Sequence, residues 1–313
     1  MKIGLVGSGY RAGFYLNIAL QDKNFEIVKI LCHSIESKEK MERLGYKATI
    51  CFNEFIKGEY DFVVVTIKKD LNYSMSKRLM NAGICVLQET PAFTNISDYN
   101  DIYNYKYKLM IAEQYKYYKY YQSLKHLIDT NVFGDIYEVE ISEVHDYHMT
   151  SVIRYLFDLD LSNVSLYGSK YKAKITKTRD RYKEYHSGEL KDLNGKHLVF
   201  DAGGIKIIYD FTGEEYRSPI RTKRLVIRGS RAELIDSRLR YLDESNEFKE
   251  KDLDLVRTDE DLMAIREVLY LSYDKFINNK NVSIKNEVED AYISCVMNEF
   301  SLEAEKKVIK LWG

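Results

Sequence analysis

Residues 1–20 of the chain, MKIGLVGSGYRAGFYLNIAL, hold the pattern that decides the fold. A mostly apolar run at residues 3–6 predicts a β-strand, and residues 7–12 follow it directly as G-x-G-x-x-A. Apolar residues then recur at helical spacing over residues 14–20. A strand, a glycine turn and a helix in this order form the context that a dinucleotide-binding fingerprint requires.

The positions of this turn have distinct physical roles in binding a pyrophosphate. Gly7 permits the tight turn, Gly9 has no side chain to block the phosphates, and Ala12 lets the helix pack closely on the strand. The helix N-terminus offers unpaired N–H groups and a positive dipole end, and Arg11 would add a charge-assisted contact. An ordinary tight turn is the alternative interpretation. We expect the cofactor to contact Gly7, Ser8, Gly9, Tyr10 and Arg11.

Composition argues against several classes of partner. The 313 residues are enough for two domains, and 47 basic residues balance 48 acidic ones along the chain. This balance does not produce the basic surface that binds nucleic acid or a membrane, and no apolar run approaches the roughly 20 residues of a membrane span. The tyrosine- and lysine-rich stretch at residues 115–121 is better explained as a helix surface than as a nucleic-acid patch. We expect a small-molecule substrate, with neither a nucleic-acid nor a membrane partner.

The cysteines and the N-terminus indicate the compartment. The first strand begins too early to leave room for a signal peptide. The four cysteines are scattered and form neither a C-x-x-C site nor an evident disulfide framework, so a reducing, cytoplasmic location is expected. They are Cys32, Cys51, Cys85 and Cys295.

Strands and helices alternate along residues 1–117 and predict an α/β fold, with a Rossmann domain over this range. The run Y-D-F-V-V-V-T at residues 60–66 is typical of a strand buried on both faces of a parallel sheet. The other strands are expected at residues 25–32, 48–51, 84–88 and 108–112, with helices over residues 37–44, 73–82 and 96–105.

Residues 118–313 follow a different pattern and predict an α+β domain with an open, mainly antiparallel sheet. Alternating stretches between residues 163 and 235 supply most of its strands. The remaining elements are expected to be a helix at residues 118–130, a strand at 136–145, a short helix at 149–157 and helices at 259–277 and 284–309.

Residues at the carboxyl ends of the parallel strands extend the expected cofactor site, because ligands of open α/β sheets bind there. The second strand ends in Cys32-His33-Ser34, without the acidic residue that commonly holds the ribose hydroxyls of NAD. The absence of this acidic residue favours NADP, but no arginine is present to bind a 2′-phosphate. Both NAD and NADP therefore remain open. His33 has the alternative of an ordinary solvent-facing loop residue. We add His33, Ser34, Thr66, Glu89 and Thr90 to the cofactor site.

Over almost its whole length the chain resembles the Gfo/Idh/MocA family of NAD(P)-dependent oxidoreductases. The resemblance is carried by G-L-V-G-S-G-Y-R-A at residues 4–12, N-A-G-I-C-V-L-Q-E-T-P at 81–91, F-G-D-I-Y-E-V at 133–139 and H-D-Y-H…S-V-I-R-Y-L-F at 145–157. It implies a Rossmann domain and a second domain with a large, mainly antiparallel sheet. It also implies a homodimer or higher homo-oligomer through that sheet, and a sugar or cyclitol substrate in the cleft between the domains.

Two departures from the family pattern affect the expected chemistry. Family members commonly carry Glu-Lys-Pro where this chain has Glu89-Thr90-Pro91, and threonine cannot supply an ammonium group to a substrate hydroxyl. The family's Asp-x-x-x-His also changes, since aligning His148 with that histidine puts Val144 at the aspartate position.

Hydride transfer at a carbinol needs a base whose pKa lies near the working pH, which makes histidine the natural choice. His148 is the first candidate because it aligns with the family's histidine, while Tyr147 and His145 would orient it or relay a proton. In a continuous strand His145 and Tyr147 would share a face and His148 would point elsewhere. If the strand ends near His145, the turn into the helix brings all three together. A structural, hydrogen-bonded histidine is the alternative for each.

Other polar residues would assist. Glu113 ends the last Rossmann strand and Tyr115 follows it, so we expect the first to aid catalysis and the second to bind substrate, or Glu113 to be an ordinary strand-end carboxylate. Arg154, on the first turns of the short helix, would bind a substrate carboxylate or form a structural ion pair. A metal held by H-x-x-H with Glu113 or Glu143 is a further alternative, and we assign no metal.

The sequence therefore predicts an NAD(P)-dependent oxidoreductase that transfers a hydride to or from a sugar-like or polyhydroxylated small molecule. One alternative is a catalytically inactive homologue that binds nucleotide as a sensor or assembly partner, which the loss of the lysine at position 90 favours. Another is a related lyase or hydrolase that uses its cofactor only transiently.

Overall fold

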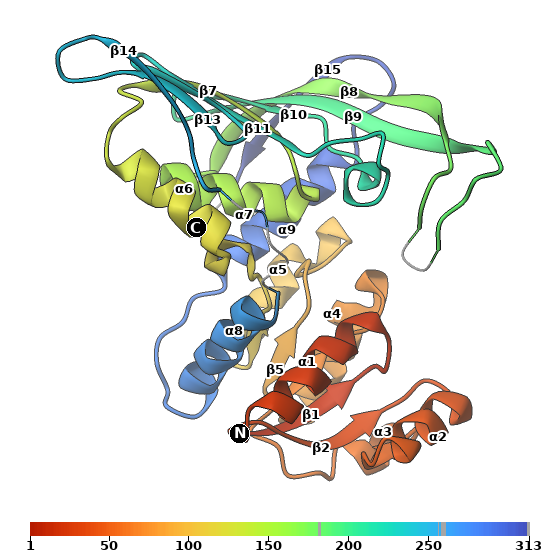
Figure 1. The fold of residues 1–313 in the computed structure, drawn as a ribbon. Coiled ribbons are helices and arrows are strands. Elements are labelled where there is room, and N and C mark those ends of the chain that lie inside the picture. The colour runs from red at the N-terminus through yellow and green to blue at the C-terminus, as the bar shows by residue number, and fades with distance from the viewer. Residues whose placement is uncertain (181–182, 256, 258–260, 312–313) are drawn as a thin grey trace. The chain divides into compact units, whose positions relative to one another are not determined.

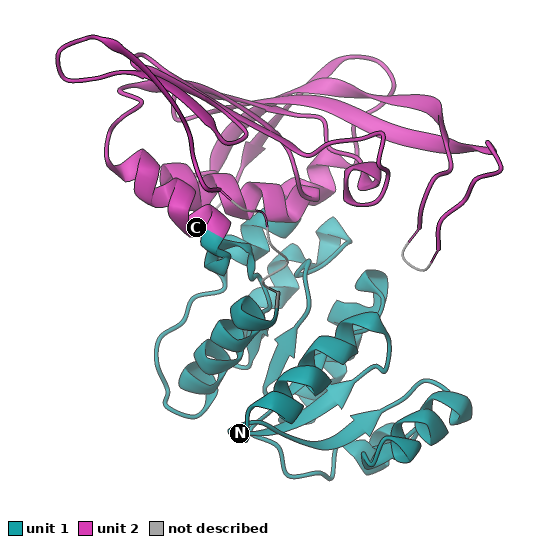
Figure 2. Cartoon of the chain, in the orientation of Figure 1, with its two compact units in different colours: residues 1–119, 259–292 teal, residues 120–258, 293–313 magenta. Residues whose placement is uncertain are grey.

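The computed structural model describes residues 1–180, 183–255, 257 and 261–311 (Figure 1). The chain divides into two compact units (Figure 2). Unit 1 comprises Met1–Lys119 and Asp259–Tyr292, and unit 2 comprises Tyr120–Thr258 and Ile293–Gly313. This division differs from the expected domains 1–117 and 118–313, because a late segment of the chain joins the first unit.

Within the described residues, unit 1 is built on a six-stranded parallel sheet in the order β3-β2-β1-β4-β5-β6. The order reverses between β1 and β4, the position at which doubly wound sheets bind dinucleotides. The strands are β1 (Lys2–Val6), β2 (Glu26–Leu31), β3 (Ala48–Thr49), β4 (Phe62–Val65), β5 (Val86–Gln88) and β6 (Leu109–Ile111). All of the strands predicted for this part are present, and the predicted Rossmann fold is confirmed.

The helices of unit 1 connect these strands. They are α1 (Tyr10–Gln21), α2 (Ile35–Arg43), α3 (Phe52–Phe55), α4 (Lys69–Asn81) and α5 (Tyr99–Ile102). The helix predicted over residues 96–105 is wrong as one element, because α5 is flanked there by two short 3-10 turns.

The core of unit 1 forms between the sheet and one face of α1. All four residues of β4 are fully buried, as the β-branched run predicted. Helix α1 buries Ala12, Tyr15 and Ile18, which lie one turn apart. Helix α8 (Asp261–Phe276) completes the same core with Ile265, Val268 and Leu269. The predicted helix at 259–277 is therefore present, apart from residues 259–260, which lie outside the described part of the chain.

Unit 2 contains a nine-stranded sheet, counted over the described residues, in the order β14-β13-β12-β11-β7-β10-β9-β8-β15. Only β7 and β10 pair in parallel among its described strands, which confirms the predicted mixed, mainly antiparallel sheet. The strands are β7 (Ile136–Ser142), β8 (Asn163–Thr176), β9 (Leu190–Ala202), β10 (Ile205–Tyr209), β11 (Arg224–Gly229), β12 (Ala232–Ile235), β13 (Arg238–Leu242), β14 (Phe248–Asp252) and β15 (Glu305–Lys310).

Two predicted boundaries in the second half of the chain need correction. The predicted helix over 284–309 is α9 (Lys285–Met297), and β15 follows it as a strand that pairs antiparallel with β8 and buries Ile309. The predicted strand at 136–145 ends at Ser142, and α7 (Asp146–Phe157) begins before the predicted residue 149. Figure 1 shows α6 (Lys119–Asp129) and α7 against one face of the sheet.

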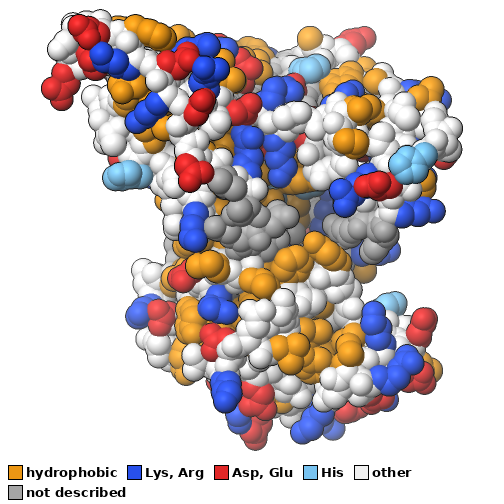
Figure 3. All heavy atoms as spheres, in the orientation of Figure 1, with side chains coloured by type: hydrophobic (Ala, Val, Ile, Leu, Met, Phe, Trp, Pro, Cys, Tyr) orange, Lys and Arg blue, Asp and Glu red, His pale blue; other side chains and the backbone are white. Residues whose placement is uncertain are grey.

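The surface agrees with the even charge balance of the sequence. On the face drawn in Figure 3, basic and acidic side chains are interspersed over both units. None of the helices in the described part of the chain has the length and apolar character needed to cross a membrane.

Candidate functional site

The glycine turn between β1 and α1 needs a glycine at position 7 for the fold itself. Gly7 has φ +106°, and a Cβ atom there would lie 2.8 Å from Thr66 Oγ1 and 2.9 Å from the Thr66 carbonyl oxygen. The N–H of Gly7 donates to the Leu31 carbonyl at 2.9 Å, which ties the turn to the end of β2. A side chain at this position would meet both backbone strain and a clash.

Gly9 is different, because any residue can adopt its backbone conformation. It has φ −86° and is the N-cap of α1 without a side-chain cap hydrogen bond. A Cβ atom at Gly9 would meet no described atom within 4 Å, so packing does not demand a glycine here. The space in front of the first N–H groups of α1 is left open, as an approaching pyrophosphate requires. Ala12 is fully buried against the sheet, so the residues of the turn fit a bound dinucleotide.

Behind the turn lies a buried polar cluster around Glu89, at the end of β5. Arg11 Nε donates to Glu89 Oε1 at 2.7 Å, and the Tyr15 hydroxyl donates to the same oxygen at 2.5 Å. Asn72 Nδ2 donates to the Glu89 carbonyl at 3.1 Å. Burial, together with the nearby Glu89 charge, raises the pKa of Tyr15 well above its ordinary value. The structure therefore joins two predicted residues, Arg11 and Glu89, in an ion pair.

Tyr15 and Asn72 are absent from the predicted site. The spacing of Arg11 and Tyr15, four residues apart on one helix, signals that their side chains share a face. Asn72 lies in α4 and is 1% exposed, which an amide rarely is without a polar partner. Its link to Glu89 depends on how α4 packs beside β5, which its own sequence does not reveal.

The remaining predicted cofactor residues surround the same strand ends. The Thr66 hydroxyl donates to the Val6 carbonyl at 2.9 Å beside Gly7. Ser34 caps α2 by accepting the Ser37 N–H at 3.2 Å, and exposed His33 lies 3.4 Å from the Ser37 hydroxyl. Ser8 is hydrogen-bonded to buried Cys32 at the end of β2. Tyr10 is 56% exposed and its ring lies edge-on to Phe14, and Thr90 is half-buried.

In unit 2 the histidine motif forms the start of α7. His145 is the N-cap of the helix, and the N–H of His148 donates to its carbonyl at 2.9 Å. The ring centroids of His145 and Tyr147 are 6.2 Å apart, and those of Tyr147 and His148 are 4.5 Å apart. Of the two alternatives left open by the sequence, the strand therefore ends early and the turn into the helix brings the three rings together.

His145 also connects the motif to a cavity within unit 2. Its ring packs against Phe211 and Tyr216, with centroids 5.3 and 5.2 Å away. Tyr216 lines a cavity of about 340 Å³ together with Arg179, Tyr185 and Ser218. Two aromatic rings, hydroxyl groups and charged side chains converge there, a lining that suits a ligand rich in hydroxyl groups.

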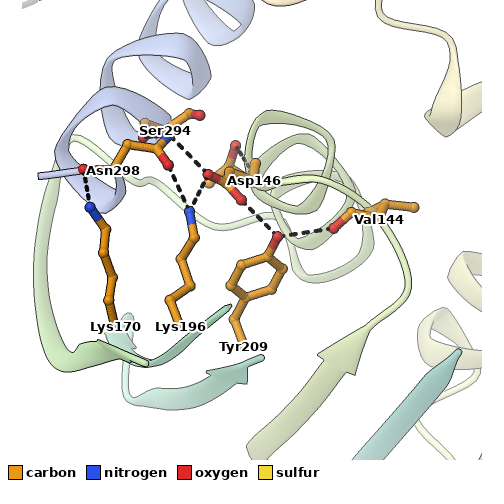
Figure 4. A network of polar contacts seen from close by, with 8 residues as sticks. Val144, Asp146, Lys170, Lys196, Tyr209, Ser294 and Asn298 are labelled. Carbon is orange, nitrogen blue, oxygen red and sulfur yellow. Dashed lines mark hydrogen bonds and ion pairs between the residues drawn. The ribbon is translucent and has the colours of Figure 1, made fainter. Parts of the chain in front are cut away.

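The fourth motif residue, Asp146, belongs to a partly buried network of polar contacts (Figure 4). Its carboxylate accepts hydrogen bonds from Lys196 Nζ at 2.5 Å, Tyr209 Oη at 2.8 Å and Asn298 Nδ2 at 3.1 Å. Burial alone would raise the pKa of Asp146, but the Lys196 charge and the hydrogen bonds from Lys196 and Tyr209 outweigh it and lower that pKa. Lys196, Tyr209 and Asn298 were not predicted from the sequence.

The geometry places three further predicted residues and corrects the position of one of them, Arg154. Glu113 accepts the Tyr115 N–H at 3.0 Å, and both residues belong to unit 1, whereas the histidines belong to unit 2. Arg154 lies in the last turn of α7, not in its first turns. Six residues separate it from His148, so the two side chains leave the helix about 120° apart.

The metal alternative has no support in the described residues. Glu143 is 1% exposed and accepts hydrogen bonds from the Tyr120 and Tyr121 hydroxyls at 3.0 and 3.1 Å. Its Oε1 also pairs with Arg257 at 2.5 Å. Over the described part of the chain, no group of three or more His, Cys, Asp or Glu side chains is arranged to hold a metal ion.

Comparisons with known proteins agree with this architecture. Residues 1–109 match the model of the Gfo/Idh/MocA group, described as an oxidoreductase family with an NAD-binding Rossmann fold. No curated protein matches the sequence significantly.

Solved structures match the chain over nearly its full length. An oxidoreductase from Thermotoga maritima has 14% identity and a TM-score of 0.71, covering 97% of this chain and 98% of its own. GenD2 from gentamicin A biosynthesis, in complex with NAD, has 11% identity and a TM-score of 0.72, covering 99% and 96%. The myo-inositol dehydrogenase of Lactobacillus casei, in complex with NAD(H) and myo-inositol, has 14% identity and a TM-score of 0.69, covering 100% and 98%.

These likenesses confirm the predicted fold for both units. The NAD-binding family match also bears out the predicted class of cofactor. Residues 1–109 of this chain therefore match the Gfo/Idh/MocA oxidoreductase family model, and they have the Rossmann fold that its description names.

Proposed function

We propose that the protein is an NAD(P)-dependent oxidoreductase that moves a hydride to or from a carbinol carbon of a polyhydroxylated small molecule. The observation that carries this proposal is the open space in front of Gly9 at the N-terminus of α1, beside the reversal point of a doubly wound sheet. Packing does not require that glycine, so its absent side chain is best explained by a ligand.

Two observations support the class of substrate. The cavity that Tyr216 lines offers aromatic rings and hydrogen-bonding side chains, which suit the apolar faces and hydroxyl groups of a sugar or cyclitol. The structurally similar myo-inositol dehydrogenase is described with a cyclitol bound. The scattered cysteines Cys32, Cys51 and Cys85 carry free thiols, which supports a reducing, cytoplasmic site of action.

In the proposed mechanism, the turn from Gly7 to Arg11 and the N-terminus of α1 bind the pyrophosphate. Ser8, Tyr10, His33, Ser34, Thr66, Glu89 and Thr90 complete the cofactor site. When bound, the nicotinamide accepts or gives the hydride. The side chains of the protein manage the proton and the orientation of the substrate.

His148 is the proposed acid–base residue, since imidazole exchanges protons near neutral pH. In the oxidative direction it takes the proton of the substrate hydroxyl as the carbinol carbon loses its hydride. Tyr147 and His145, whose rings lie beside it, orient the histidine or relay the proton. Glu113 is proposed to assist catalysis, with Tyr115 and Arg154 binding substrate.

The test is a spectrophotometric screen of NAD⁺ and NADP⁺ reduction with inositols, sugars and sugar acids. With the substrate so identified, His148→Gln is expected to lower kcat by about 10²–10⁴-fold. The matched control is His126→Gln, an exposed histidine of α6, which should leave kcat unchanged. A His148→Gln enzyme with kcat within about threefold of the parent would remove this residue from the proposed role.

A second candidate function is favoured by Thr90, which replaces the lysine of the family pattern. A nucleotide-binding sensor or assembly partner would bind NAD(H) and show no turnover in the screen. A lyase or hydrolase that uses its cofactor transiently would convert substrate without net cofactor reduction.

A further inference from the structure

Asp146 occupies the middle of the His145–His148 motif, yet its side chain is bound to three other elements of unit 2 (Figure 4). Lys196 comes from β9, Tyr209 from β10 and Asn298 from the residue after α9. Residues separated by 50 to 152 positions along the chain thus meet at the first turn of α7.

Both carboxylate oxygens of Asp146 are used. Oδ2 accepts from Lys196 and from Asn298, while Oδ1 accepts from the Tyr209 hydroxyl. The side chains of Asp146 and Lys196 are only 13% and 12% exposed, so solvent screens their ion pair little. Charge-assisted hydrogen bonds in such surroundings are short and directional.

The network also holds the backbone on both sides of His145. The Tyr209 hydroxyl lies 3.2 Å from the Val144 carbonyl oxygen while it binds Asp146. Lys196 Nζ donates to Asn298 Oδ1 at 3.0 Å, which fixes the amide that binds Asp146. The residues before and after His145 are therefore anchored to the sheet.

We propose that Lys196, together with Tyr209 and Asn298, is a positioning residue for His145 and His148: by holding Asp146 it fixes the first turn of α7 and balances the negative charge beside the two histidines. The proposal rests on the proposed function. A buried ion pair adds little net stability compared with apolar side chains of similar size. We therefore expect the Asp146–Lys196 ion pair to affect the position and the protonation of the two histidines more than the stability of the fold.

Several charged and titratable groups of the described residues face the motif. Asp146 faces Lys196 and Tyr209, and His145 faces Tyr147 on its own helix and Tyr216 beyond β10. Lys196 is the cation that pairs with Asp146. Its removal leaves the carboxylate adjacent to His145 without that cation, and a nearby negative charge favours the protonated imidazole.

The test replaces each of two neighbouring lysines. Lys170 and Lys196 are cross-strand partners on β8 and β9, and both reach Asn298. Lys170 Nζ donates to the Asn298 carbonyl at 2.6 Å, whereas Lys196 also binds Asp146. Lys170→Met is therefore a matched control for Lys196→Met, and Lys196→Arg keeps the positive charge.

The readout is the pH titration of histidine side chains by NMR on the full-length protein labelled at histidine, without substrate. Signals are assigned with His145→Gln and His148→Gln. We expect Lys196→Met to raise the titration midpoint of His145 by about 1 pH unit. Lys170→Met and Lys196→Arg should stay within about 0.3 unit of the parent, since both leave a cation at Asp146.

Tyr209→Phe provides a second variant that keeps the buried ring and removes only the hydroxyl that binds Asp146 and Val144. We expect it to move the ring resonances of His145, while Lys170→Met leaves them in place. Folded Lys196→Met and Tyr209→Phe proteins whose His145 and His148 signals and midpoints match the parent would overturn the proposal.

Kinetics separate this proposal from the proposed function. With the substrate from the screen, Lys196→Met should lower kcat about tenfold or more, leave the KM of the cofactor unchanged, and be rescued by Lys196→Arg. An active parent whose Lys196→Met variant retains kcat and histidine midpoints contradicts the positioning role alone. A parent without turnover contradicts the proposed function, while the NMR titration still decides whether Lys196 controls the histidines.

Discussion

At the scale of single residues, Gly7 and Gly9 lie in one turn but are glycines for different reasons. Gly7 is required by its positive φ and by the short approach to Thr66. Gly9 has an ordinary φ, and a Cβ there would meet no described atom within 4 Å. The fold therefore explains the first glycine, and we propose that a bound ligand explains the second.

Tyr15 makes a prediction about alkaline stability. Its hydroxyl donates to Glu89, and burial raises its pKa well above the value of about 10 that it has in the unfolded chain. Above pH 10 the unfolded tyrosine loses its proton while the folded one keeps it, so stability is lost as the pH rises. The expected loss from this residue is about 1.4 kcal/mol per pH unit.

The measurement is the free energy of unfolding from urea titrations between pH 8 and pH 11.5. Tyr15→Phe should be about 1 kcal/mol less stable at pH 8, because it lacks one buried hydrogen bond. Above pH 10 its stability should fall less steeply than that of the parent. Identical slopes for the two proteins would show that Tyr15 titrates as it does in the unfolded chain.

The sequence predicts only part of the site at this scale. The glycine turn, Glu89 and the adjacency of His145, Tyr147 and His148 follow from short-range patterns. Lys196 and Tyr209 do not, because their contact with Asp146 depends on the pairing of strands 50 and 63 residues away. A lone lysine in an alternating strand carries no signal that it will be buried.

At the scale of elements, short-range patterns predict the presence of a strand better than they predict where helices and strands begin and end. The strands of the parallel sheet were all expected, since continuous apolar runs leave little choice. The segment E-K-K-V-I-K of β15 is short and charged, so its own sequence does not identify it as a strand. It is extended because it pairs with β8, which a local pattern does not reveal. Helix α7 begins at Asp146, three residues before the predicted start. The side chain of Asp146 is bound by Lys196 of the sheet, a contact that the local sequence does not reveal.

Helix α8 shows the same limit for the expected domains. Its apolar residues predict a helix, but nothing local shows that they pack against α1 instead of the second sheet. Ile265, Val268 and Leu269 are each 1% exposed within the core of unit 1. The Rossmann unit therefore depends on a segment that follows strands β7 to β14 of the second sheet in the sequence.

This packing predicts the effect of truncating one side chain of α8. Leu269→Ala should lower the free energy of unfolding by about 2–5 kcal/mol, because it opens a cavity beside α1. Met263 is 57% exposed on the same helix, so Met263→Ala should change stability by less than about 0.5 kcal/mol. Urea unfolding followed by circular dichroism checks both. Equal effects from the two variants would contradict the placement of α8 in this core.

At the scale of the whole molecule, the open face of the second sheet is the proposed oligomer interface. Leu225 and Ile227 of β11 are fully buried, and Val226 between them lies on the other face of the sheet and is 6% exposed. Val226 pairs with Ile235 of β12, which is 39% exposed. Arg228 on the same face pairs with Glu138 and Glu140 of β7. We propose that this face of paired charges, with the exposed Ile235, associates with a second copy of the chain.

We expect a homodimer or a larger homo-oligomer in sedimentation experiments at micromolar concentration. Ile235→Lys should shift the equilibrium towards the monomer, because it replaces the exposed apolar side chain of this face with a charge. Ile220→Lys is the control, since Ile220 is 54% exposed in a loop outside the strands. A parent that sediments as a monomer at tens of micromolar, or an Ile235→Lys variant with unchanged assembly, would rule out this interface.

The central claim is that unit 1 binds a nicotinamide dinucleotide on the turn before α1. The most direct test is calorimetric titration of the protein with NAD(H) and NADP(H), repeated on Gly9→Asp. We expect micromolar binding of at least one cofactor to the parent. We expect no detectable binding to a folded Gly9→Asp protein, because the new carboxylate would fill the open space and repel the phosphates. Failure of the parent to bind either cofactor, or equal binding by the variant, would contradict it.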